Sequence, residues 1–173
     1  MNTEFEAYPV DRFIEVVKAW IEHPWPITAA EARNIYESLG YSTVPEDPEM
    51  FASPFADGEA DSYYVTVKGL VSTVDIAVAR PCNAGEEEES SAAIASAYDA
   101  FCQAINSHYK NMISATRSEA GSTEWTFTSD VELDVSVWNR SVSTCIHSPY
   151  MTQLRREEKE MGLTSYDDIL EDD

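Results

Sequence analysis

Residues 131–146, VELDVSVWNRSVSTCI, decide the fold of this 173-residue chain. Up to residue 137, apolar residues alternate with polar ones, which is the pattern of a strand buried on one face. Asn139-Arg140 then predicts a turn, after which residues 142–146 alternate again. Residues 125–127 begin another strand just before this hairpin. The stretch therefore predicts a three-stranded antiparallel meander.

Upstream of this meander, residues 63–78 predict a separate hairpin. Apolar and polar residues alternate on both sides of Gly69, which lies near the expected turn. With the meander, the hairpin gives an antiparallel sheet of about five strands.

Helical periodicity surrounds these strands. A long central helix is predicted over residues 87–114, and its continuous apolar face includes Phe101 and Cys102. Flanking helices are predicted over residues 10–23, from Thr28 to Gly40, and from Ser148-Pro149 to Gly162. Hairpin-linked strands with helices mainly on one face predict the α+β class. We expect one domain over residues 1–163 and an acidic C-terminal tail over residues 164–173.

Residues 41–61 have a different character. Pro45, Pro48, Pro54 and Gly58 interrupt any regular pattern, and the segment holds six acidic residues without Lys or Arg. It is predicted to be a long loop, with at most a short extended stretch. Loops of this length in a compact domain are uncommon and are often functional.

The charge balance is the most unusual property of the composition. The chain has 32 acidic and 11 basic residues, a formal net charge of −21. Nucleic acids and anionic membranes are therefore not expected as partners, because phosphate binding needs clustered Lys and Arg. A basic protein partner is expected instead, with a merely well-solvated surface as the alternative. No signal peptide or membrane span is predicted, so the cytoplasm is the expected location.

No residue pattern indicates catalysis, a cofactor or a metal. His23, His108 and His147 lack metal-ligand spacing, and the row Asp130, Glu132 and Asp134 lacks the pattern of a calcium loop. Phosphate-binding glycine motifs are missing too. The three Cys residues suggest free thiols rather than a disulfide framework. We therefore expect a non-enzymatic protein without a cofactor or metal.

The candidate partner-binding residues are surface acids and one tryptophan. Trp138 should point outward beside the acids of its strand, and an exposed Trp is a typical interface anchor. The alternative is that residues 41–61 or a helix cover it. The candidates are Glu46, Asp47, Glu49, Asp57, Glu59, Asp61, Glu132, Asp134, Trp138, Asp167 and Asp168.

Three short segments carry a family resemblance. Trp25-Pro26, the helix end at residues 38–41, and Ser148-Pro149-Tyr150 frame the predicted helices, hairpin and meander. In this order the chain resembles small acidic α/β immunity proteins of bacterial, and especially actinobacterial, polymorphic toxin and contact-dependent inhibition systems. The resemblance implies a cytoplasmic protein that binds and neutralises a cognate toxin domain. Many such toxins are basic nucleases, and their acidic partners cover the phosphate-binding site.

Two other functions remain open at this point. An acidic secretion-type chaperone has a similar size and isoelectric point, but it usually dimerises. A DNA mimic would block a nucleic-acid enzyme through spaced carboxylates, with strong dependence on salt. We expect a monomer rather than a dimer, because self-repulsion at this net charge opposes association.

Overall fold

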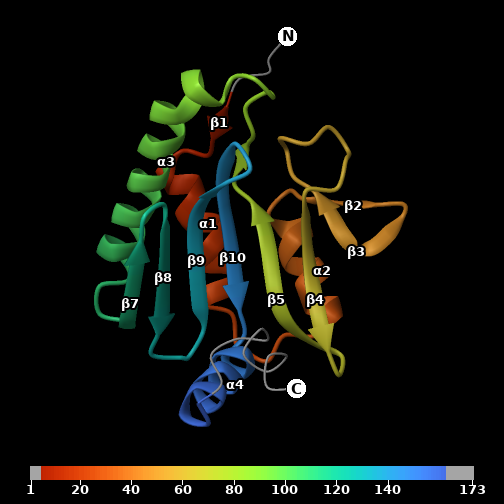
Figure 1. Cartoon of the computed structure of the whole chain (residues 1–173). Helices are drawn as coiled ribbons and strands as arrows, with labels where there is room; N and C mark the ends of the chain where they lie inside the picture. The colour runs from red at the N-terminus through yellow and green to blue at the C-terminus, as the bar shows by residue number, and fades with distance from the viewer. Residues whose placement is uncertain (1–4, 163–173) are drawn as a thin grey trace, which may run out of the picture.

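A computed structural model describes residues 5–162 (Figure 1). This part of the chain contains four helices and ten strands, and the strands follow one another in runs, which confirms the α+β class. The helices are α1 (Val10–Ile21), α2 (Ala29–Ser38), α3 (Glu87–His108) and α4 (Pro149–Glu160). The strands are β1 (Glu6–Ala7), β2 (Ser42–Val44), β3 (Asp47–Ala52), β4 (Ser62–Val67), β5 (Leu70–Ala77), β6 (Ala79–Arg80), β7 (Ile113–Glu119), β8 (Ser122–Phe127), β9 (Glu132–Trp138) and β10 (Ser141–His147).

The main sheet has eight antiparallel strands in the order β2-β3-β4-β5-β10-β9-β8-β7. It consists of two four-stranded meanders, which join where β5 pairs with β10. The two remaining described strands, β1 and β6, form a separate small sheet. The predicted hairpin is β4–β5 and the predicted meander is β8–β9–β10, so both are confirmed. The predicted number of about five strands is wrong.

Two errors explain the missing strands of the main sheet. Residues 41–61 are not one long loop, because they contain β2 and β3 at one edge of the sheet. The central helix ends at His108 rather than near residue 114, and Ile113 begins β7 at the opposite edge. Pro48 and its acidic neighbours interrupt alternation in β3, and β7 is polar or small after Ile113, so neither strand has a clear sequence signal.

The hydrophobic core lies between the sheet and the helices α1, α2 and α3. Phe13 and Trp20 of α1, Tyr36 of α2, and Phe101 and Ile105 of α3 are buried. In Figure 1, α1 and α2 lie behind the sheet, while α4 lies beyond one end of it. The opposite face of the sheet is turned toward the viewer. Of the described helices, none is long and apolar enough to cross a membrane.

The helix caps follow the sequence signals closely. Thr28 accepts a hydrogen bond from the Glu31 backbone N–H over 3.2 Å, and Gly40 after α2 has a φ of +89°. Ser148 accepts from the Met151 N–H at the start of α4. These contacts satisfy groups that a helix end leaves without partners, so both helices start where the sequence predicts.

Candidate functional site

The face of the sheet turned away from α1, α2 and α3 carries polar side chains in rows across the strands. Cross-strand pairing aligns Asp75 of β5, Cys145 of β10, Asp134 of β9 and Glu124 of β8. Residues paired in this way share one face of a sheet. Three acidic residues thus lie in one row across four strands, with Cys145 between Asp75 and Asp134.

A pocket of about 290 Å³ lies at one end of this face, beside the β9–β10 turn. Trp138 forms one wall and is 69% exposed. Asp61 and Asp75 contribute carboxylates, and Ser141, paired with Trp138, lines the pocket as well. Asn139 and Arg140 adopt positive φ angles of 49° and 63°, as a tight two-residue hairpin turn requires. This turn fixes Trp138 opposite Ser141.

The pocket is acidic, and its lining residues include no Lys, Arg or His among those that the structure describes. Asp61 accepts hydrogen bonds from the Ser53 N–H and from the hydroxyls of Ser53 and Ser62, which are neutral donors. Burial raises the pKa of the Asp75 carboxyl above its ordinary value, and the nearby Asp61 charge adds to this effect. Both carboxylates therefore lack a cation in the pocket.

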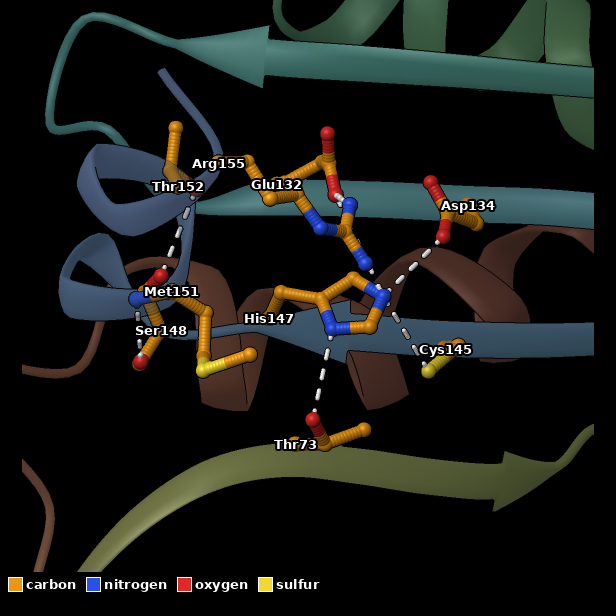
Figure 2. Close-up of polar contacts among 9 residues, drawn as sticks. All are labelled: Thr73, Glu132, Asp134, Cys145, His147, Ser148, Met151, Thr152 and Arg155. Carbon is orange, nitrogen blue, oxygen red and sulfur yellow. Dashed lines mark hydrogen bonds and ion pairs between the residues drawn. The ribbon is translucent and has the colours of Figure 1, made fainter. Parts of the chain in front are cut away.

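A second cluster surrounds His147 further along the same face. Figure 2 shows its ring between Asp134, Cys145 and Thr73. The Nε2 atom lies 3.1 Å from Asp134 Oδ2 and 3.7 Å from Cys145 Sγ, and Nδ1 lies 3.3 Å from Thr73 Oγ1. A neutral ring with its proton on Nε2 donates to Asp134 and accepts from Thr73. The ring is thus held from both sides.

Arg155 joins α4 to this cluster. It donates a hydrogen bond of 2.5 Å to Glu132 Oε2, and Glu132 is buried in the sheet. Burial raises the pKa of Glu132, and the Asp134 charge raises it further. The Arg155 guanidinium lowers the pKa of Glu132 and so partly offsets these two effects, because its positive charge favours the ionised form of Glu132. The cluster thereby attaches α4 to the end of β9.

The proximity of Cys145, His147 and Asp134 does not make a nucleophilic triad. A triad orients the base through the nitrogen that does not face the nucleophile, whereas here Nε2 faces both Cys145 and Asp134. Burial, together with the charges of Asp75 and Asp134, raises the pKa of the Cys145 thiol to about 12. The reactive thiolate is therefore scarce at neutral pH.

Glu132, Asp134 and His147 are the described side chains placed closely enough to hold a metal ion, with ligand atoms within 4.8 Å of one another. However, Arg155 donates to the Glu132 oxygen that lies nearest to His147. A divalent cation would have to compete with this arginine. Hydrogen bonds among Thr73, Asp134, His147, Glu132 and Arg155 hold the cluster together, although the buried Asp134 Oδ1 has no partner within residues 5–162.

The structure divides the sequence-predicted candidates among several places. Asp61 and Trp138 meet in the pocket, and Glu132 and Asp134 belong to the His147 cluster. The expectation that Trp138 points outward is confirmed, whereas Glu132 is buried. The remaining described candidates lie elsewhere on the surface: Glu46, Asp47 and Glu49 on the β2–β3 hairpin, and Asp57 and Glu59 in the segment that leads to Asp61. Asp167 and Asp168 lie outside the described residues.

Sequence reasoning missed Asp75, Ser141, His147 and Arg155. The sequence does give a partial signal, because Asp75 lies in the predicted hairpin at a polar position of the alternating pattern. Its closeness to the β9–β10 hairpin depends on the pairing of β5 with β10. That pairing cannot be read from local periodicity.

Comparison with known proteins gives one match. Neither a curated protein nor a solved structure matches the chain. A model for a family of unknown function (DUF6301) matches residues 11–148, which run from the start of α1 to the residue before α4. The matched region contains both strands of the β9–β10 hairpin and every residue that lines the acidic pocket. The chain therefore belongs to this family, DUF6301.

Proposed function

We propose that this chain is a non-enzymatic immunity protein that binds a basic toxin domain and neutralises it through the open polar face of its sheet. The observation that carries the proposal is the pocket in which exposed Trp138 stands beside Asp61 and Asp75. An accessible indole beside carboxylates that lack a lining cation is suited to anchor a basic protein.

The charge of the whole chain supports the same proposal. A net charge of −21 attracts a basic partner over distance and speeds the encounter at low salt. The same charge makes two copies of the chain repel each other, which favours a monomer. Binding in the cytoplasm would protect the producing cell, as the resemblance to immunity proteins implies. If the toxin is a nuclease, the acidic face would cover its phosphate-binding site.

Kinetic binding tests the proposal, with the toxin domain that the proposal expects to be encoded beside this gene as the partner. Absence of such a neighbouring toxin gene would contradict the immunity proposal. Trp138→Ala should speed dissociation by a factor that corresponds to about 2 kcal/mol, as expected for an interface hot spot. Tyr150→Ala is the matched control, because Tyr150 is an exposed aromatic residue on α4, outside the pocket. It should leave dissociation unchanged.

Charge reversal on the β2–β3 hairpin tests long-range attraction separately. Changing Glu46, Asp47 and Glu49 to Lys should slow association and weaken its dependence on salt, because these acids lie outside the pocket. Absence of binding to the neighbouring toxin domain would contradict the immunity proposal. A molecular mass of this protein in solution that doubles as its concentration rises would favour a dimeric chaperone. Equal binding to many unrelated basic proteins would favour a DNA mimic.

A further inference from the structure

The two carboxylates of the acidic pocket approach it from different segments. Asp75 lies on β5, and Asp61 comes directly before β4. Burial raises the pKa of Asp75 most, the Tyr63 hydrogen bond lowers it, and the nearby Asp61 charge raises it by a smaller amount. A cation placed between Asp61 and Asp75 would offset both the burial penalty of Asp75 and the repulsion between the two carboxylates, since it interacts favourably with both.

An unpartnered hydroxyl provides independent evidence for a ligand. Ser141 is only 6% exposed, and its Oγ has no hydrogen-bond partner within residues 5–162. Ser141 pairs with Trp138 across the hairpin, so its side chain lies on the same face as the indole and lines the pocket. A buried hydroxyl without a partner costs free energy, and a ligand that donates a hydrogen bond there recovers it.

We propose that this pocket recognises the side chain of one arginine from a basic partner protein, with the guanidinium stacked on Trp138 and hydrogen-bonded to Asp61, Asp75 and Ser141. The inference deepens the proposed function and rests on it for the nature of the partner. The cavity of about 290 Å³ has room for one such side chain.

Arginine fits these groups better than lysine does. Its planar guanidinium stacks on an aromatic face and presents five N–H donors in a fixed fork. That fork has enough N–H donors for two carboxylates and one hydroxyl. A lysine ammonium is a more strongly hydrated point charge with three donors, and it does not stack on an indole face in this way.

A direct test titrates the intact protein with N-acetyl-arginine amide and follows backbone amide signals by two-dimensional NMR. Shifts should concentrate at Asp75, Ala77, Asn139, Ser141 and Ser143, which line the pocket. N-acetyl-citrulline amide keeps the shape of the arginine probe and removes its charge, so it should bind at least about tenfold more weakly. N-acetyl-lysine amide should also bind more weakly.

Three variants and one control locate the interaction. Asp75→Asn, Asp61→Asn and Trp138→Ala should each weaken binding of the arginine probe by about tenfold. Glu124→Gln is the matched control, because Glu124 lies on the same face but outside the pocket. It should bind the probe like the wild type. Unchanged melting temperatures for Trp138→Ala and Glu124→Gln would show that any loss does not come from unfolding.

Several results would overturn the inference: equal binding of the citrulline or lysine probe, shifts outside the pocket, or no saturable binding. A failure of the pocket inference can be distinguished from a failure of the proposed function. If the arginine probe binds but the neighbouring toxin domain does not, the pocket inference stands and the immunity proposal fails. If the toxin domain binds and all three pocket variants bind it normally, the pocket inference fails and the immunity proposal stands.

Discussion

Phe13 of α1 and Phe101 of α3 stack on each other, with their ring centroids 3.9 Å apart and their planes inclined by 6°. Both side chains are almost completely buried. This pair joins the N-terminal helix to the long helix that packs on β9 and β10. It therefore connects the first and second halves of the chain on the covered side of the sheet.

Truncation of Phe101 should be strongly destabilising. Phe101→Ala removes a buried aromatic ring and should lower the free energy of unfolding by about 3–5 kcal/mol. Urea denaturation followed by circular dichroism measures this change. Gln103→Ala, at an exposed position of the same helix, should stay within about 0.5 kcal/mol of the wild type. Similar stability of the two variants would contradict the central role of α3 in the core.

The three cysteines should react slowly in the folded protein. All three are free; Cys82 is buried, and Cys102 and Cys145 are half-buried. Burial raises the pKa of the Cys102 thiol and, together with nearby carboxylates, that of the Cys145 thiol to about 12. Thiol titration at neutral pH should therefore be slow in native protein and should reach three equivalents after denaturation. Rapid native modification of Cys102 would contradict its placement against the core.

Two adjacent arginines of α4 should contribute unequally to stability. Arg155→Ala leaves buried Glu132 without its guanidinium and should cost about 1–3 kcal/mol. Arg156 pairs with Asp130 at the surface, so Arg156→Ala should cost clearly less than Arg155→Ala. Thermal unfolding of both variants makes the comparison. Equal melting temperatures of the two variants would show that the Glu132–Arg155 contact stabilises the fold no more than the surface pair does.

Asp75→Asn should stabilise the protein at neutral pH. Burial raises the folded-state pKa of Asp75 above its unfolded value, so the ionised carboxylate opposes folding. The wild type should lose stability as the pH rises from the unfolded pKa of Asp75 through its folded pKa. The amide variant lacks this loss, so its advantage should disappear below about pH 4. Denaturant unfolding across this range measures the difference; an advantage that persists in acid would indicate another cause.

The sequence predicts the parts of the fold whose signals are local. Alternation within residues 131–146 marks β9 and β10, and the Thr28–Glu31 capping box marks the start of α2. Strand β7 was missed because all of its residues after Ile113 are exposed and polar or small. Met112 and Ile113 also continue the helical spacing of α3, and no Gly or Pro lies between His108 and Ile113 to mark the end of the helix.

The candidate site was only partly predictable, because local patterns do not show which distant strands pair. Trp138 was recognised from its outward position in an alternating strand, and Asp61 from its place in an acidic segment. Their common pocket also needs Asp75 and Ser141, which come together through the register of β5 on β10 and of β10 on β9. Such register depends on packing between distant segments, and periodicity within one segment does not determine it.

The junction between β5 and β10 has a consequence for the time course of folding. Each four-stranded meander is built from strands that follow one another closely, so its pairing closes only short loops. Pairing Val74 with Ile146 instead closes a loop that includes α3 and most of the second meander. Closing a long loop lowers the entropy of the chain before the new contacts can stabilise it. Non-local pairing therefore slows folding. The last and slowest step should therefore be the docking of two preformed half-sheets, and the acidic pocket, which needs strands from both halves, would appear only when this step is complete.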